Sequence, residues 1–470
     1  MSADASTEAR PNVIFILSDD HGYADRSALG IDPAVRTPNL DRLANSGVSC
    51  TQAYVTAPIC SPSRAAIMAG QYQQRWGAKW FDSSAFGEHT TTLAEQFAEQ
   101  GYATGYFGKV HYGTEDAGDR ACPPQHGFAE SFYGLAGQQM GRLHYLRHSE
   151  QAVAEYGPAA TPMGVLPLYD GKEQVAYEGF LTAELGRRAR EFVADHAAEP
   201  FFCMLAFNAI HNFCFQLPAE ELEQRDLPAY GDWDPAETEY LEWYEDVIWP
   251  NLDGGREYYL AQLELMDTQI GLLLDELDRR GLAENTIVVY TTDNGGSTCN
   301  FGVNTPLRGT KYTIDEGGIR VPFLVRWPGG GITGGGDFEG LTSTMDLYPS
   351  LLSAAGAPAS AYAHCDGVEQ LAGWRGQVAG GHEHLFWDCG FQWAVRDSDW
   401  KLSWIEDGPR AADLKHREHA SLEPGLRLTR LSTDVGETVN LADQHPDVVA
   451  RLQEKFTAWQ REVDPAAASP

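Results

Sequence analysis

Short apolar runs alternate along the chain with segments whose apolar residues recur every three or four positions. The runs NVIFIL (12–17), PFFCMLAFN (200–208) and TIVVYTT (286–292) are continuous enough to predict buried strands. Helical periodicity predicts helices over about 175–197 and about 256–280. This alternation is typical of an α/β fold with a large, mostly parallel central sheet flanked by helices.

Two shorter helices are predicted from their start and stop signals. TPNLDRLANSG has Pro38 in its first turn and Gly47 at its end, and TTLAEQFAEQG repeats the plan with threonine caps and Gly101. Further strands are predicted in YATGYFGK and VPFLVRW. We therefore expect one large α/β domain over residues 10–355.

The pattern changes after this point. Short aromatic strands are predicted in HLFWDCGFQWAVRDSDWKLSW (384–404) and GLRLTRLS (425–432), followed by an amphipathic helix in HPDVVARLQEKFTAWQREV (445–463). Residues 356–466 are therefore expected to form a smaller subdomain, with an antiparallel sheet and a closing helix.

Charge limits the choice of partners. With 34 basic and 67 acidic side chains the formal net charge is −33, which would repel nucleic acid and an anionic membrane surface. An anionic substrate would therefore need a local cationic pocket. No apolar run is long enough to span a bilayer, and the polar start MSADASTEAR indicates a cytoplasmic protein if Met1 is native, or a periplasmic or secreted one if a signal peptide was trimmed.

The cysteines are scattered and form no C-x-x-C pair or zinc-type spacing, so neither a disulfide framework nor a zinc site is predicted. They are Cys50, Cys60, Cys122, Cys203, Cys214, Cys299, Cys365 and Cys389.

Acidic side chains follow two of the predicted strands. Asp19 and Asp20 end NVIFILSDDHG, and Asp293 and Asn294 end TIVVYTTDNGG. Ligands of open α/β sheets bind beyond the carboxyl ends of strands, so both pairs are expected to face one crevice. Three carboxylates so close require a cation, and oxygen ligands favour Ca²⁺ or Mg²⁺. The alternative is a hairpin turn in DNGG and a helix cap in SDDHG.

The segment PICSPSR suggests a reactive group in an anion pocket. If a helix begins near Pro62, Cys60 lies at its N-terminus, where free N–H groups favour negative charge, and Arg64 lies one turn further on the same face. Alternatives are a thiol of low pKa acting directly as a nucleophile and an inert buried cysteine.

Other cationic groups follow predicted strands, namely Lys109, His111, His211 and Lys311. Lys109 and His111 would point the same way if the backbone between them is extended. His144 and His148 lack the intervening glutamate of a metalloprotease motif, so no metal role is assigned to them. His21, His382 and His384 are interpreted as structural.

From about Pro11 to about Val463 the chain resembles the type I, formylglycine-dependent sulfatases of the alkaline phosphatase superfamily. The resemblance rests on six ordered motifs, with a late VRDSDWKL: PNVIFILSDDHG, TPNLDRLANSGVSCTQAYV, CSPSRAAIMAGQY, GKVHYG, TTDNGG and LRGTKYTIDEGGIRVPFLVRWPG. Val110 stands where the family usually has Trp, and AIHNF replaces the commoner A-P-H-x-P around His211.

The resemblance implies that Cys60 is converted to formylglycine by a generating enzyme that recognises C-x-P-x-R. It also implies a divalent metal, usually calcium, with magnesium as the other option. The implied metal ligands are Asp19, Asp20, Asp293, Asn294 and residue 60. The implied anion-binding and proton-transfer residues are Arg64, Lys109, His111, His211 and Lys311.

The resulting hypothesis is hydrolysis of sulfate esters. The hydrated aldehyde of residue 60 would attack sulfur while the metal, Lys109 and Lys311 neutralise the sulfate oxygens. Asp293 would accept the proton of the attacking hydroxyl, His211 would protonate the leaving alcohol, and His111 would help to deprotonate the second hydroxyl. The alternatives are a phosphonate or phosphate ester hydrolase of the same superfamily, and an inactive module that binds sulfated glycans.

A sulfated carbohydrate is the expected substrate, because long loops carry side chains that could stack on sugar rings or hydrogen-bond to them. Core packing of the tryptophans is the alternative. The side chains concerned are Arg142, His144, His148, Trp80, Trp233 and Trp243.

Overall fold

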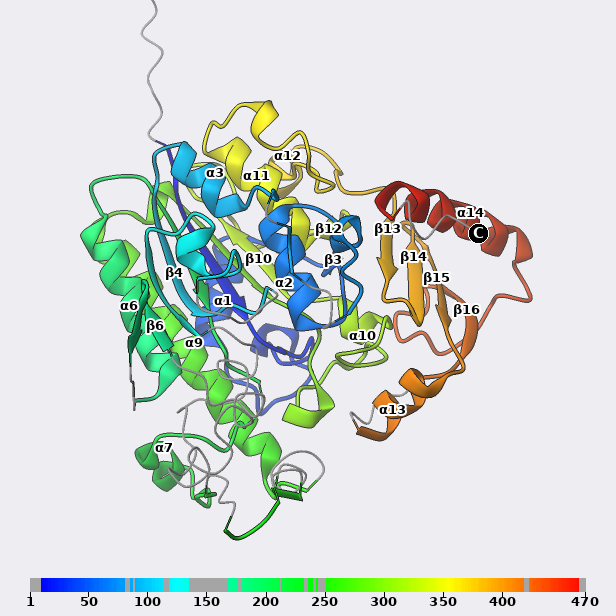
Figure 1. Cartoon of the computed structure of the whole chain (residues 1–470), viewed down its shortest axis with the longest axis horizontal. Coiled ribbons are helices and arrows are strands. Elements are labelled where there is room, and N and C mark those ends of the chain that lie inside the picture. The colour runs from blue at the N-terminus through cyan, green and yellow to red at the C-terminus, as the bar shows by residue number, and fades with distance from the viewer. Residues whose placement is uncertain are drawn as a thin grey trace, which may run out of the picture.

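A computed structural model shows the arrangement of the chain (Figure 1). None of the helices it describes combines the length and the apolar character needed to cross a membrane. The residues described are 10–80, 85–87, 89–112, 118–134, 168–175, 177, 179–211, 213–231, 236–239, 242–243, 251–417 and 422–464.

A ten-stranded mixed sheet forms the centre of the large domain. Its five middle strands, in the order β9-β1-β8-β4-β5, are all parallel, whereas β10 runs antiparallel to β9 and to β2. The predicted α/β fold is confirmed, with parallel pairing in the middle, antiparallel pairing on either side of it, and a last parallel pair between β11 and β2. In spatial order the strands are β11 (Gly336–Phe338), β2 (Val48–Cys50), β10 (Phe323–Arg326), β9 (Thr286–Thr292), β1 (Asn12–Ser18), β8 (Phe201–Ala206), β4 (Ala103–Lys109), β5 (Glu130–Gly134), β6 (Leu168–Asp170) and β7 (Glu173–Val175).

Both faces of this sheet are covered by helices, which explains why its strands read as continuous apolar runs. Val13 and Phe15 of β1 pack in one core cluster with residues of α2 (Cys60–Ala69), α3 (Leu93–Glu99) and α11 (Leu347–Ala354). Ile14 and Ile16, which point the other way, pack with residues of α1 (Pro38–Asn45), α6 (Leu181–Asp195) and α9 (Gly255–Arg280).

The predicted helices are present, and the largest shift of a boundary is at the start of α6. Helix α9 occupies almost the expected range, and α3 begins with a capping box in which Thr92 and Glu95 bond each other's backbone N–H groups. Helix α6 begins at Leu181 rather than near 175, because residues 173–175 form the edge strand β7. Further helices are α7 (Ala219–Gln224), α10 (Glu316–Ile319), α12 (Leu371–Trp374) and α13 (Pro409–Arg417).

A second, four-stranded antiparallel sheet lies at the C-terminal side of the molecule (Figure 1). Helix α14 (Pro446–Val463) covers it, with the ring of Phe456 stacked on Trp393 at a centroid distance of 4.4 Å. The expected antiparallel sheet and closing helix are therefore confirmed. Its strands are β13 (Leu385–Asp388), β14 (Gln392–Arg396), β15 (Trp400–Ile405) and β16 (Gly425–Arg430), and a short pair is formed by β3 (Ala53–Tyr54) and β12 (Thr342–Ser343).

A nearly buried histidine connects the segment before β13 to the start of α11. His382 Nε2 lies 2.7 Å from Asp346 Oδ1. Burial lowers the pKa of His382, but the charge of Asp346 and its hydrogen bond outweigh burial and raise it above the usual value. The stability that this pair contributes is thus complete below the unfolded pKa of about 6.5 and is lost as pH rises through the folded pKa.

We therefore expect the Tm of the protein to fall as pH rises above about 6.5, and to fall less steeply in a His382→Gln variant. Thermal denaturation measured over a pH series checks this. His89→Gln changes an exposed histidine and serves as the control. Equal slopes for the wild type and the His382→Gln variant would show that the pair does not titrate in this range.

Candidate active site

The two acidic segments meet at one end of the sheet, as expected. Strands β1 and β9 are parallel neighbours with Ser18 opposite Thr292, so the residues that follow them emerge side by side. The backbone N–H of Asp20 lies 3.3 Å from Asp293 Oδ1, and Asn294 Nδ2 lies 2.6 Å from Asp20 Oδ1. Three carboxylates and one carboxamide therefore share one buried space.

Glycine makes this close approach possible after β9. A Cβ atom added at Gly295 would lie 1.8 Å from the carbonyl oxygen of Gly317, an impossible contact with backbone. The chain after Asn294 can therefore pack against the start of α10 only if this position is glycine. Packing at the site thus explains Gly295 in TTDNGG. The alternative of a hairpin turn is not supported, because β9 is followed by a 3-10 turn (Thr298–Asn300) and α10 before the next strand.

Helix α2 brings Cys60 to the carboxylates. The helix begins at Cys60 itself, two residues earlier than the expected start near Pro62. Cys60 Sγ lies 3.6 Å from Asp19 Oδ1 and 4.0 Å from Asp20 Oδ1. Arg64, one turn further on the same helix, donates from Nε to Asp293 Oδ2 at 2.7 Å. All ten residues of the helix are buried, so both side chains are held in the interior of the site.

Two lysines and a histidine complete the group. Lys109, the last residue of β4, forms an ion pair with Asp19, and Lys311 Nζ lies 2.9 Å from Asp20. His211 Nε2 lies 3.1 Å from Lys311 Nζ and 3.6 Å from Asp20 Oδ2. The cationic side chains expected inside an acidic protein therefore lie together, and each lysine is paired with one aspartate.

The expected geometry of His111 is wrong in one respect. Strand β4 ends at Lys109, and His111 has φ 56, a left-handed conformation. Its side chain therefore does not follow from extended alternation with Lys109. It is still close enough to the site to be affected by its charges. Burial, followed by the charges of Lys109 and Arg64, lowers the pKa of His111.

The carboxylates differ in their protonation behaviour. Burial, with the nearby charge of Asp293, raises the pKa of Asp19 to about 7 in spite of Lys109 and Arg64. Burial likewise raises the pKa of Asp20. Burial would also raise the pKa of Asp293, but Arg64 and the two lysines outweigh it and lower that pKa. Without a further cation, the aspartates cannot all be ionised at low cost.

The thiol of Cys60 is a poor candidate for a nucleophile in its unmodified form. Burial, followed by the charge of Asp293, raises its pKa well above the usual value. The interpretation of Cys60 as a low-pKa thiolate is therefore not supported, although it lies at a helix N-terminus. An inert core cysteine is not supported either, because its Sγ faces two carboxylates.

The donor set fits a divalent cation. Ligand atoms of Asp19, Asp20, Cys60 and His211 all lie within 4.8 Å of one another. Asn294 Oδ1 is buried without a hydrogen-bond partner, which is the state expected of an oxygen that has a cation to bind. A set dominated by oxygen atoms suits Ca²⁺ or Mg²⁺.

Sequence patterns did not reveal one residue of this site, Asn300. Its Nδ2 lies 3.5 Å from Asp20 Oδ2 and also donates to the carbonyl of Ile210. Asn300 therefore links the aspartate to the segment that carries His211. It lies in a short 3-10 turn (Thr298–Asn300), where no periodicity marks it, and only its position shortly after TTDNGG could have suggested a role.

Of the side chains expected to contact sugar rings, the structure describes only Trp80 and Trp243. Trp80 and Trp243 are each 8% exposed and pack in core clusters, Trp80 against Phe391 and Trp243 against Phe213. Core packing is thus the better explanation for these two. Arg142, His144, His148 and Trp233 lie outside the described residues.

The fold and the site described above can be assigned to a known protein family. The family model described as Sulfatase matches residues 11–357. The chain therefore belongs to the type I sulfatase family and is a sulfuric ester hydrolase.

Among curated relatives, arylsulfatase A of Bos taurus is 30% identical over an alignment of 475 residues including gaps. The alignment covers 95% of this chain and 86% of the relative. Steryl-sulfatase of Rattus norvegicus is also 30% identical, over 81% of this chain and 73% of the relative. The crystal structure of Ps i-CgsB in complex with k-i-k-neocarrahexaose superposes with a TM-score of 0.79 at 25% identity, covering 97% of this chain and 94% of that one.

Proposed function

We propose that this enzyme hydrolyses sulfate esters of carbohydrates with a formylglycine formed from Cys60 and a bound Ca²⁺ or Mg²⁺. The observation that carries the proposal is the position of Cys60 Sγ, 3.6 Å from Asp19, in a group that also holds Arg64, Lys109 and Lys311. The sequence C-S-P-S-R around Cys60 is the pattern that a formylglycine-generating enzyme, the proposed maturation partner, would recognise.

Two groups supply chemistry that the unmodified chain lacks. A divalent cation held by Asp19, Asp20, Asp293, Asn294 and residue 60 would neutralise the negative charge of the sulfate. A hydrated aldehyde at residue 60 would supply two hydroxyl groups on one carbon, one to attack sulfur and one to allow release of sulfate. An unmodified thiol offers only one nucleophilic group on that carbon and cannot do both.

The surrounding side chains orient the ester and move protons. Arg64 spans Asp293 and Asp19 and so fixes the carboxylates around residue 60. The ammonium groups of Lys109 and Lys311 would hold sulfate oxygens. Both groups are buried and already in position, so little reorganisation is needed when the sulfate binds. Asp293, the carboxylate whose pKa is lowered, would accept the proton of the attacking hydroxyl, and His111 would accept that of the second hydroxyl.

His211 is the proposed acid for the leaving alcohol. It is 12% exposed at the side chain, more than the lysines and carboxylates beside it, and its Nε2 lies 3.1 Å from Lys311 Nζ. An alkoxide is a poor leaving group, so a proton delivered to its oxygen is needed during bond cleavage.

We expect His211→Ala to reduce kcat on an alkyl or sugar sulfate by about 10²- to 10⁴-fold. The loss should be much smaller on 4-nitrophenyl sulfate, whose phenolate leaves without a proton. Steady-state kinetics with both substrates check this difference. His89→Ala, which changes an exposed histidine, is the matched control, and equal losses on the two substrates would contradict the assignment.

Support for a saccharide substrate comes from Ps i-CgsB, which is similar over nearly the whole chain and was crystallised with k-i-k-neocarrahexaose. The similarity to steryl-sulfatase and arylsulfatase A leaves smaller alcohols and phenols as the competing substrates.

The decisive experiment measures sulfate release from a panel of defined sulfated saccharides, aryl sulfates and matched phosphate esters. The proposal expects the highest kcat/KM on a saccharide sulfate. A clear preference for phosphate or phosphonate esters would favour the related hydrolase activity. Equal turnover of aryl sulfates and all glycans would remove the case for a saccharide, and glycan binding without any sulfate release would indicate an inactive binding module.

A further inference from the structure

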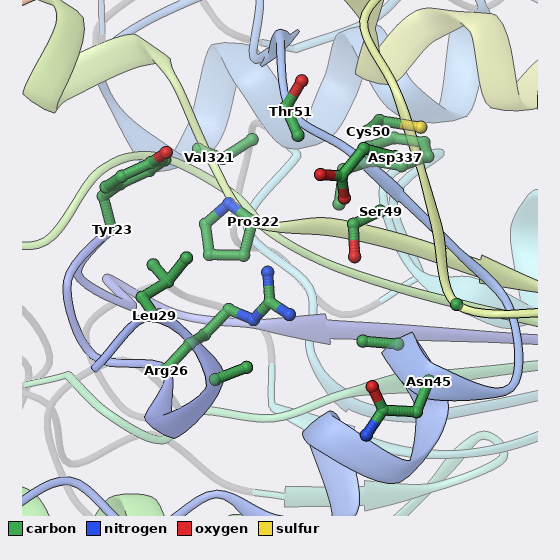
Figure 2. A pocket seen from close by; sticks show the side chains of 14 residues that line it. Tyr23, Arg26, Leu29, Asn45, Ser49, Cys50, Thr51, Val321, Pro322 and Asp337 are labelled. Atoms are coloured by element: carbon green, nitrogen blue, oxygen red, sulfur yellow. The ribbon is translucent and has the colours of Figure 1, made fainter. Parts of the chain in front are cut away.

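A cavity of about 260 Å³ lies over β10 and β2, outside the catalytic group (Figure 2). Strand β10 pairs with β9 so that Phe323, which lines the cavity, is opposite Thr291, two residues before Asp293. The cavity is therefore at the same end of the sheet as the proposed active site, but over neighbouring strands. It shares no lining residue with the catalytic group.

Arg26 is the feature that makes this cavity unusual. The residue is 8% exposed, and Figure 2 shows its guanidinium extending into the cavity. Its Nε has no hydrogen-bond partner, and in the described part of the chain no carboxylate forms an ion pair with it. A buried charge without a partner is costly, so it needs a reason to be there.

Asp25, the residue before Arg26, does not neutralise it, because the Asp25 carboxylate is already bound by other side chains. Asp25 lies 2.6 Å from Arg256 Nη2 and accepts a hydrogen bond from the Tyr259 hydroxyl at 2.7 Å. Burial lowers the pKa of Arg26 and outweighs the charge of Asp41, which raises it. The Asp41 carboxylate is itself engaged, because it accepts hydrogen bonds from the Ser27 hydroxyl and the Ala28 N–H. The guanidinium thus retains its hydrogen-bonding capacity toward a molecule that enters the cavity.

The walls of the cavity supply the complementary groups. Tyr23, Ser49 and Thr51 contribute hydroxyl groups, and Asp337 is an exposed carboxylate. Figure 2 shows Ser49 and Asp337 on one side of the Arg26 guanidinium and Tyr23 with Leu29 on the other. An anionic group suits the guanidinium, and hydroxyl groups suit a neighbouring carboxylate that can accept their hydrogen bonds.

Charge and size further limit the class of ligand that fits the cavity. The carboxylate of Asp337 would repel a second negative charge, so the cavity favours a monoanion over inorganic sulfate. Cavities for drug-sized ligands are about 300–1,000 Å³, and this one is slightly smaller, which suits a molecule the size of one sugar.

We propose that this cavity binds a small hydroxylated monoanion, with its anionic group on Arg26 and its hydroxyl groups on Ser49 and Asp337. The anionic group is a carboxylate, as in a uronic acid, or a sulfate monoester, as in a sugar monosulfate. This second site does not depend on the proposed function of the catalytic group.

Isothermal titration of the full chain with glucuronate tests the proposal, with glucose as the neutral probe and inorganic sulfate as the dianion. Glucose 6-sulfate is titrated into a Cys60→Ala chain, which cannot turn it over. We expect one or both monoanions to bind, glucose not to bind, and Arg26→Met to weaken monoanion binding about tenfold or more. Asp337→Asn should strengthen sulfate binding by removing a repulsive charge.

Matched measurements separate a binding site from a structural role. The unliganded Arg26→Met chain should melt at or above the Tm of the wild type, because it loses a buried charge without a partner. Arg279→Met removes an exposed arginine that pairs with Glu276 and should leave binding unchanged. Binding of both monoanions that is equal in wild type and Arg26→Met would overturn the proposal, as would saturable binding of neither. Arg26-dependent binding of only one monoanion would support it and identify the anionic group.

Discussion

A chain that carries Cys60→Ala is expected to lose sulfate ester hydrolysis by about 10⁴-fold or more, the scale on which removal of a nucleophile acts in other hydrolases. The physical reason is positional. Residue 60 is the group that α2 aims at the carboxylates, with Sγ 3.6 Å from Asp19 Oδ1. Sulfate release measured on the best saccharide and on an aryl sulfate provides the test.

Cys60→Ser separates a modified residue from an ordinary nucleophile. A serine hydroxyl could attack sulfur once, but it has no second hydroxyl on the same carbon to expel sulfate, so we expect at most about one turnover per chain. Cys122→Ala, at a buried cysteine outside the group, should retain full activity and serves as the control. Sustained turnover by the serine variant would contradict the proposed chemistry.

Mass spectrometry of the peptide that contains residue 60 completes this prediction. Active preparations should contain the aldehyde in place of the thiol, in proportion to their specific activity. Fully active enzyme with an unmodified Cys60 would exclude formylglycine.

Removal of the proposed metal is expected to have the second large effect. Treatment with a chelator should abolish activity and lower the Tm, because the carboxylates of Asp19 and Asp20 would then remain buried beside Asp293 without the cation. A ligand present at 100 times its Kd stabilises a folded protein by about 2.7 kcal/mol, so the change in Tm should be easy to measure. Addition of Ca²⁺ should restore both properties.

An Asp20→Asn variant tests the ligand assignment directly. We expect purified protein to contain much less metal by elemental analysis and to show little response of Tm to chelator or Ca²⁺, whatever its activity. Asp278→Asn changes an exposed aspartate that pairs with Arg42 and is the matched control. Wild-type metal content in the Asp20→Asn variant would remove this residue from the proposed ligand set.

The order of strands and helices could be predicted because it depends on local patterns. Continuous apolar runs gave β1, β8 and β9, since a strand covered on both faces has no polar side. The sequence pattern predicts too early a start for α6, because the short edge strand β7 has no pattern of its own. The antiparallel direction of β10 depends on how the chain returns after α10, which local periodicity does not encode.

Much of the site was also predictable, because polar residues at the ends of buried strands stand out against apolar runs. Asp19, Asp20, Asp293 and Asn294 were found in this way, and the structure brings them together. Asn300 could not be predicted, because it lies in a short 3-10 turn without periodicity. The conformation of His111 could not be predicted either, because a left-handed residue at the end of a strand leaves no mark in the spacing.

By itself, the sequence determined which segments are buried strands and helices, and which polar side chains follow them, because these properties depend on neighbours in the chain. Only the tertiary structure decided which charges meet. Lys109 pairs with Asp19, Lys311 with Asp20 and Arg64 with Asp293, whereas Arg26 forms no ion pair with any carboxylate in the part of the chain that the structure describes. These contacts join residues up to 291 positions apart, and their energies depend on burial and on distances of a few ångströms.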